Sequence, residues 1–162
     1  MMSPYPFTLG LSMLIIISPK EARDLVDRSN QCENVLSIND LSYVNFTDAQ
    51  KSKIHNLLEL QFQDVEQPSM MGAPKLENID AIAVWAQVCE SENAIIHCSG
   101  NGSRSVSAGL ITMVEWGYGV DHASTMVKIM CPKAKPNLLM LHLYGNSDLI
   151  EAAVARFNLT KV

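Results

Sequence analysis

The sequence lacks the patterns by which protein chains usually hold a metal ion. Its four histidines, at positions 55, 97, 122 and 142, are widely spaced and form no H-E-x-x-H motif. Its four cysteines include no C-x-x-C pair and no Cys/His cluster at the spacing of a zinc site. We therefore predict no metal site, and we expect ordinary surface or core roles for the histidines rather than metal binding.

Cysteine is also too sparse for a disulfide framework. Cys32, Cys89, Cys98 and Cys131 are scattered along 162 residues, a length that supports one ordinary domain with its own apolar core. Disulfide-dense domains are smaller and reside in oxidising compartments. The cysteine content therefore favours a reducing compartment, and we expect a cytoplasmic protein.

The chain has neither a long apolar run nor an excess of positive charge. The apolar patch at residues 9–17 is too short to span a bilayer and is interrupted by Gly10 and Ser12. No basic residue precedes this patch and no A-x-A site follows it, which makes it a poor signal peptide. With 12 Lys and Arg against 17 Asp and Glu, the net charge is −5. We therefore expect no binding to nucleic acids or membranes by bulk electrostatics.

What is present is an alternation of short apolar runs and helical patterns. The expected strands cover residues 13–17, 34–40, 57–65 and 94–98, and the segment 46–56 is polar and expected to be weakly structured. The expected helices cover residues 18–29, 74–90, 104–116, 121–130 and 146–157, and a further helix is expected to open at Asn137. This order predicts a single α/β domain over residues 1–162, with a central, mostly parallel sheet of four to five strands flanked by helices.

Capping residues support several helix boundaries. Ser18 is expected to cap the first helix, with Pro19 at the first helical position and Glu21 three residues after the cap. Asp121 and Ser147 are the expected caps of two later helices.

The stretch AIIHCSGNGSRS, residues 94–105, places a cysteine where a buried strand is expected to end and a helix to begin. A cysteine attacks as the thiolate, and a helix N-terminus favours that form through its unpaired N–H groups and the positive end of its dipole. The linking residues SGNGS are nearly free of side chains, so their backbone N–H groups can surround an anion. The stretch therefore predicts an oxyanion-binding loop with Cys98 as a nucleophile.

Three polar residues around this loop have expected roles. Arg104 carries a planar guanidinium that can grip two phosphate oxygens. Ser105 is expected to hydrogen-bond the sulfur of Cys98 and to stabilise it as a leaving group. His97 is expected to lie beside the sulfur at the strand end and to orient the loop by hydrogen bonding.

The segment HCSGNGSRS, residues 97–105, resembles the H-C-(x)5-R-[ST] signature of the protein tyrosine phosphatase superfamily. The short chain and the segment CPKAKPN, residues 131–137, are most similar to its small dual-specificity members, including the compact bacterial ones. The resemblance extends from the strand near Ile15 to the helix after Asn137. It implies the cysteine-dependent phosphatase fold and hydrolysis of phosphomonoesters, on protein tyrosine, serine or threonine or on small substrates, through a phosphocysteine and without a cofactor. The residues implied to hold the phosphoryl group are Ser99, Gly100, Asn101, Gly102, Ser103 and Arg104.

The resemblance also implies a carboxylic acid that protonates the leaving oxygen. In the family an aspartate about thirty residues before the cysteine has this role, and Asp64 lies 98 − 64 = 34 residues before Cys98. Asp64 ends an expected extended run and opens a loop that contains proline and glycine, which suits a mobile acid. Glu66 is the second candidate, and the alternative is that the site has no such acid and Asp64 is an ordinary solvated or capping residue. Asn137 either supports the phosphate-binding loop or only caps the helix that it opens.

Asn101 departs from the family pattern, which has glycine at this position. Asparagine tolerates positive φ better than other non-glycine residues, so the loop can keep its shape, but a non-catalytic phosphate-binding module is an alternative function. Phosphoinositides, nucleotides and RNA 5′ ends are alternative substrates, which the acidic balance and the lack of lysine in the signature disfavour. Lys133 and Lys135 are expected in a solvated hinge. A rhodanese-like sulfurtransferase also places a cysteine before a helix, but it resembles this signature less.

Overall fold

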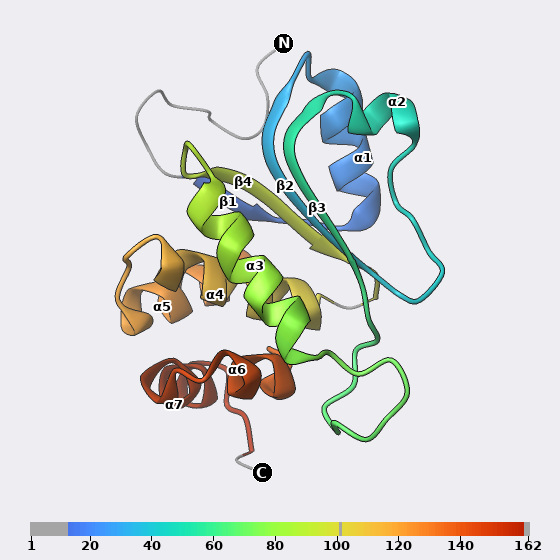
Figure 1. The fold of residues 1–162 in the computed structure, drawn as a ribbon. Coiled ribbons are helices and arrows are strands. Elements are labelled where there is room, and N and C mark those ends of the chain that lie inside the picture. Colours follow the sequence, from blue (N-terminus) through green and yellow to red (C-terminus); the bar gives the residue numbers. More distant parts are fainter. Residues whose placement is uncertain (1–12, 101, 161–162) are drawn as a thin grey trace.

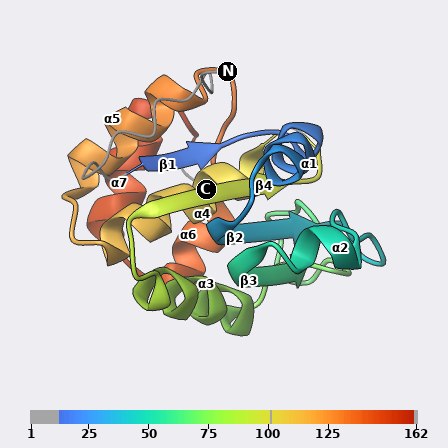
Figure 2. The same ribbon diagram turned by 90° about the horizontal axis from the view of Figure 1, so that it is seen from above.

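The computed structural model describes residues 13–100 and 102–160 of the chain. Its centre is a sheet of four parallel strands in the order β1-β4-β2-β3, shown side by side in Figure 2. The strands are β1 (Met13–Ile16), β2 (Cys32–Asn39), β3 (Ile54–Gln61) and β4 (Asn93–Cys98). The predicted α/β fold with a central parallel sheet is confirmed, and β4, which ends at Cys98, lies between β1 and β2.

Helices cover both faces of this sheet (Figure 1). One face carries α1 (Pro19–Arg28) and the short α2 (Asp48–Lys51). The other face carries α3 (Leu76–Val88), α4 (Ser103–Glu115), α5 (Val120–Met130), α6 (Leu138–Tyr144) and α7 (Ser147–Arg156). Within the described residues, no helix combines the length and the apolar character needed to cross a membrane.

Successive side chains of the strands alternate between two apolar clusters, one on each face of the sheet. In β2, Val35 belongs to the cluster that includes α1, whereas Leu36 belongs to the cluster that includes α3 to α7. In β4, Ile95 belongs to the α1 cluster, whereas Ile96 and Cys98 belong to the other one. This alternation directs the side chain of Cys98 to the face that carries α4.

Helix α4 runs through the interior and packs against the sheet at close range. Every residue from Arg104 to Met113 is buried. A Cβ at Gly109 would lie 2.6 Å from Cδ1 of Ile16, so glycine at this position allows α4 to approach β1. The position of α4 against β1 in turn determines where its N-terminus meets the end of β4.

The structure corrects the prediction for residues 46–65 in three places. Strand β3 begins at Ile54, inside the segment expected to be weakly structured, rather than at residue 57. Thr47 and Gln50 form a capping box, each side chain bonding the other's backbone N–H, and this box starts α2 in a segment expected to be weakly structured. Strand β3 ends at Gln61 rather than at residue 65, because its partner β2 ends opposite it at Asn39. Beyond this point the N–H of Gln63 donates instead to the carbonyl of Gly72 at 2.7 Å.

Two of the three expected caps are also corrected. Ser18 caps α1 as predicted, accepting from the N–H of Glu21. The N-cap of α5 is Gly119, and Asp121 lies in the first turn, where its charge favours the helix dipole. The N-cap of α7 is Asn146 rather than Ser147, because the Asn146 side chain accepts from the N–H of Leu149 at 3.0 Å.

Candidate active site

The loop between β4 and α4 turns the chain from the sheet into the helix through two glycines. Cys98 is the last residue of β4, and Gly102 is the N-cap of α4. Gly100 and Gly102 have φ angles of +89° and +88°, in the left-handed region that other residues rarely adopt. A Cβ at Gly100 would lie 3.6 Å from Nη2 of Arg104, and a Cβ at Gly102 would lie 3.6 Å from Cβ of Ala134, which are ordinary contact distances. The backbone conformation, rather than lack of space, therefore requires glycine at these positions.

The thiol of Cys98 contacts the first turn of α4. Its Sγ lies 3.3 Å from Oγ of Ser105, and that Oγ lies 3.0 Å from the carbonyl oxygen of Gly102, to which it donates. Cys98 is only 2% exposed. A serine hydroxyl can rotate its hydrogen from one acceptor to another, so Ser105 can accept from a thiol or donate to a thiolate. The contact places the sulfur at the helix N-terminus, where unpaired N–H groups stabilise negative charge.

The other loop residues predicted to bind phosphate surround the same turn. Ser99 follows Cys98, and its N–H donates to the carbonyl of Ile38 in β2 at 3.0 Å. Gly100 and Gly102 form the turn itself, and Ser103 is the first residue of α4. Asn101 lies outside the described residues. The structure therefore brings Ser99, Gly100, Gly102, Ser103 and Ser105 together with Cys98 at the end of β4.

Arg104 is a buried guanidinium whose two terminal nitrogens, Nη1 and Nη2, are both hydrogen-bonded. It is 2% exposed, and its Nη1 donates to the carbonyl of Phe62 at 2.6 Å while its Nη2 donates to the carbonyl of Ser99. Nε is buried and has no hydrogen-bond partner within the part of the chain that the structure describes. A buried charged donor without a partner is costly, so the arrangement favours binding of an anion at Nε.

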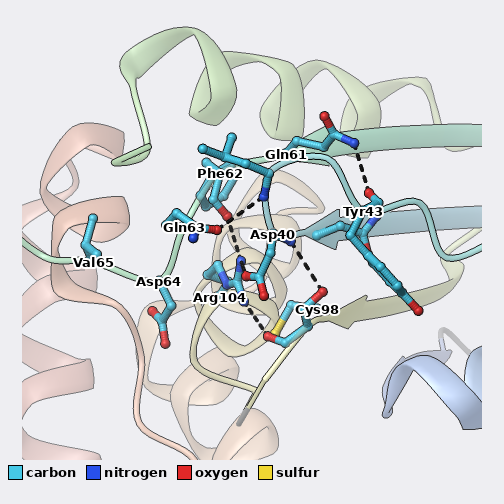
Figure 3. Close-up of polar contacts among 12 residues, drawn as sticks. Asp40, Tyr43, Gln61, Phe62, Gln63, Asp64, Val65, Cys98 and Arg104 are labelled. Carbon is cyan, nitrogen blue, oxygen red and sulfur yellow. Dashed lines mark hydrogen bonds and ion pairs between the residues drawn. The ribbon is translucent and has the colours of Figure 1, made fainter. Parts of the chain in front are cut away.

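Asp40 is a site residue that the sequence analysis did not identify. It lies directly after β2, and its Oδ1 is 2.9 Å from Nη1 of Arg104 (Figure 3). Its N–H also donates to Oγ of Ser99 at 3.4 Å. The signal in the sequence is weak, because Asp40 stands at the end of an expected strand among turn residues. Only the order of the strands brings it next to Arg104.

Asp64 and Asn137 lie side by side, and Asp64 stands two residues after Phe62, whose carbonyl accepts from Arg104. Asp64 is exposed, and its Oδ1 accepts from Nδ2 of Asn137 at 2.9 Å. The same Nδ2 donates to the carbonyl of Val65 at 3.1 Å. Glu66, the second candidate acid, accepts instead from the N–H of Leu138 at 3.3 Å. Both carboxylates therefore accept hydrogen bonds from residues at the start of α6.

Asn137 links the loop after β3 to two helices. It is fully buried, and its Oδ1 caps α6 by accepting from the N–H of Met140 at 3.1 Å. Its N–H donates to Oγ of Ser107 in α4 at 2.7 Å, and that hydroxyl donates to the carbonyl of Asn137 at 3.0 Å. Asn137 therefore both caps α6 and contacts the loop that carries Asp64.

His97 occupies the opposite face of the sheet from Cys98. Its Nε2 lies 2.6 Å from Oγ of Ser37 and 3.2 Å from Nδ2 of Asn45, and Phe46 packs edge-on against its ring. Burial, with a smaller contribution from the charge of Arg23, lowers the pKa of His97 to about 4. The imidazole is therefore neutral at pH 7, and its Nε2 contacts neighbouring side chains rather than the loop.

A groove of about 750 Å³ opens beside the loop. Cys98, Gly100, Gly102 and Ser105 line one side of it. The remaining lining is mostly apolar and comes from β1, the start of α1 and the α5–α6 connection: Met13–Ile17, Ser18, Glu21 and Met130–Ala134. Among the described residues, the charged ones of the lining are Glu21 and Lys133, and Lys135 is exposed outside it.

The other thiols are poor nucleophiles, and the described residues offer no metal site. Burial raises the pKa of Cys89 to about 11 and also raises the pKa of Cys32 and of Cys131, whose thiols are therefore protonated at neutral pH. All four cysteines are free. Across residues 13–100 and 102–160, no three His, Cys, Asp or Glu side chains are grouped so as to hold a metal ion.

Comparison with known proteins finds similarity in structure rather than in sequence. No protein-family model matches the chain, and neither does any curated protein sequence. Among solved structures, Tk-PTP in its active form matches with a TM-score of 0.56 and 19% identity, covering 85% of this chain and 92% of that one.

Two mammalian structures match over a similar length. A mouse protein described as a dual specificity phosphatase, crystallised with zinc tungstate, matches with a TM-score of 0.58 and 20% identity, covering 92% of this chain and 98% of that one. Human DUSP28 matches with a TM-score of 0.57 and 16% identity, covering 88% and 94%. The chain therefore has the fold of the small dual-specificity phosphatases of the protein tyrosine phosphatase superfamily, as its signature indicates.

Proposed function

We propose that this protein is a single-domain, cysteine-dependent phosphomonoester hydrolase that acts on phosphorylated proteins or small phosphomonoesters in the cytoplasm. One observation carries the proposal: a buried cysteine contacts Ser105 in the first turn of α4, and the preceding residue of that turn is a buried arginine whose Nε has no partner in the described chain. A phosphoryl group offers the oxygens that such donors require. The zinc tungstate bound by the mouse neighbour supports this proposal, since tungstate is a tetrahedral oxyanion like phosphate.

In the proposed reaction, Sγ of Cys98 attacks phosphorus, and a P–S bond forms as the P–O bond to the leaving group breaks. Arg104 and the backbone N–H groups of the loop stabilise the charge on the remaining oxygens. Protonated Asp64 gives its proton to the leaving oxygen. Water then attacks the phosphocysteine and loses a proton to Asp64, while the Ser105 hydroxyl donates to the departing sulfur.

The groove is best suited to a substrate whose leaving group has an apolar or aromatic body, such as a phosphorylated side chain of a protein. Its lining is mainly apolar, and Lys133 is its one cationic residue among those described. Phosphoinositides and nucleotides carry several negative charges and need several cations for binding. The lining therefore supports protein or simple aryl phosphates over these alternatives.

Hydrolysis of para-nitrophenyl phosphate by wild type and Cys98→Ser tests the proposal. We expect turnover by wild type, inhibition by vanadate and no turnover by the variant, because serine is a far weaker nucleophile than a thiolate. Equal rates for the two proteins would refute the catalytic role of Cys98. If tungstate still bound to both, the site would be a phosphate-binding module.

A further inference from the structure

Arg104 is held by the residues that directly follow three neighbouring strands. Asp40 follows the last residue of β2, Phe62 follows that of β3, and Ser99 follows that of β4. The pairing register places these three strand ends together, with Asn39 opposite Gln61 and Ile38 opposite Cys98. The guanidinium therefore lies where the carboxyl ends of three parallel strands meet.

The three partners leave one part of the guanidinium free. Nη1 uses its two N–H groups for the carbonyl of Phe62 and the carboxylate of Asp40, and Nη2 uses one for the carbonyl of Ser99. Of the five N–H groups of an arginine, Nε–H has no partner among the described residues, and one Nη2–H is left over after the single bond of Nη2 to Ser99. These are the donors that can bind an oxyanion.

We propose that Asp40 is a positioning residue, which holds Nη1 of Arg104 so that Nε and the second N–H of Nη2 are presented to the phosphoryl group. This inference rests on the proposed function. Two of the three partners are neutral carbonyls, and Asp40 is the carboxylate ion-paired with Arg104 in the described structure. A buried guanidinium needs such a counter-charge as well as hydrogen bonds to stay in place without a bound anion.

A competing role for Asp40 would be to repel the phosphoryl dianion, since both carry negative charge. The geometry favours positioning over repulsion. The side chain of Asp40 is 52% exposed, so water and salt screen its charge, whereas that of Arg104 is 2% exposed and depends on direct contacts for its orientation. The Asp40 contact also lies on Nη1, so it does not occupy Nε.

The test measures tungstate binding by titration calorimetry in Asp40→Ala and Asp40→Asn, because binding can be read without turnover. Alanine removes the acceptor, and we expect affinity to fall about tenfold, as misplaced groups lose binding and rate steeply. Asparagine keeps Oδ1 as an acceptor for Nη1, and we expect affinity within about threefold of wild type. The control Asp80→Ala removes an exposed carboxylate in the second turn of α3 and should leave affinity unchanged.

Two further measurements separate positioning from general damage. The rate of Cys98 alkylation by iodoacetamide, a neutral reagent that does not need the anion-binding donors, should match wild type in both variants, since neither changes the contact between Cys98 and Ser105. The kcat/KM for para-nitrophenyl phosphate should fall by the same factor as tungstate affinity. Tungstate binding to Asp40→Ala as tight as to wild type, or tighter, would overturn the inference. A wild type that binds tungstate but has no turnover would refute the proposed function and leave the binding test of Asp40 valid, whereas a wild type that binds no tungstate would overturn both.

Discussion

The side chain of Asn137 caps α6 and holds the loop that carries Asp64, so substituting it by alanine should affect stability and catalysis together. The substitution removes the cap on the N–H of Met140 and the two hydrogen bonds from Nδ2 to Asp64 and Val65. The two hydrogen bonds of the Asn137 backbone with Ser107 remain. The change is therefore confined to the cap and to the bonds that anchor the loop at residues 62–75, called the acid loop after Asp64, its proposed acid.

The expected loss of stability can be divided between these two parts. Loss of an asparagine N-cap costs about 1 kcal/mol. The two bonds from Nδ2 contribute about 0.5–1.5 kcal/mol each, at the lower end for exposed Asp64, whose carboxylate can bond to water instead. Together these give about 2–3 kcal/mol for Asn137→Ala. Asn146→Ala in α7 is the matched control, because Asn146 caps its helix in the same way and, among the described residues, has no hydrogen bond to the acid loop.

Urea unfolding followed by circular dichroism measures this difference. We expect the midpoint to fall in both variants without a change in slope, and the loss for Asn137→Ala to exceed that for Asn146→Ala by about 1–2 kcal/mol. In assays of turnover, Asn137→Ala should lower kcat/KM for phenyl phosphate, a poor leaving group, about tenfold, and for para-nitrophenyl phosphate far less, since only the poor leaving group depends strongly on the acid. Asn146→Ala should leave both rates unchanged.

Equal destabilisation by the two alanine variants would show that Asn137 is only a cap. A loss of rate that is the same for both substrates would show that the anchor does not act through Asp64. Either result refutes the reasoning, and Asn137→Asp gives an independent check. Aspartate keeps an oxygen that can cap α6, but it puts a carboxylate beside Asp64 in place of the Nδ2 donor. Its kcat/KM for phenyl phosphate should therefore fall as much as that of Asn137→Ala, whereas its free energy of unfolding should fall less.

Two further predictions follow from the loop and from the sheet. His97 has a pKa of about 4 when folded against 6.5 when unfolded, so its contribution to stability is present above pH 6.5 and is lost as pH falls towards 4. From this group we expect the free energy of unfolding to be about 2 kcal/mol lower at pH 5 than at pH 7. In urea unfolding, His97→Gln should not show this decrease. A variant with the same pH dependence as wild type would contradict the prediction. Gly102→Ala and Gly117→Ala both place alanine at positive φ, which should lower the free energy of unfolding by about 1–2 kcal/mol each. Only Gly102→Ala should weaken tungstate binding, because only Gly102 lies in the loop after Cys98. Equal affinities of the two variants in calorimetry would argue against this loop as the oxyanion site.

The sequence by itself determined the fold class and the local order of the candidate site. Apolar runs that alternate with helical patterns indicated a parallel sheet between helices, because each element must bury one face. The cysteine, the small-residue linker and Arg104 are contiguous, so a strand, a turn and a helix start could be recognised in one stretch. Their resemblance to the phosphatase signature then predicted the fold that the structural neighbours share.

Only the tertiary structure decided which distant residues meet that stretch. Asp40 and Phe62 reach Arg104 because the register of three parallel strands aligns their ends, and register is a property of pairing rather than of any one segment. His97 is next to Cys98 in sequence but faces away from it, because side chains alternate along a strand. Asn137 reaches Asp64 over 73 positions of sequence. Contacts of this kind depend on how helices and strands pack, which no local pattern records.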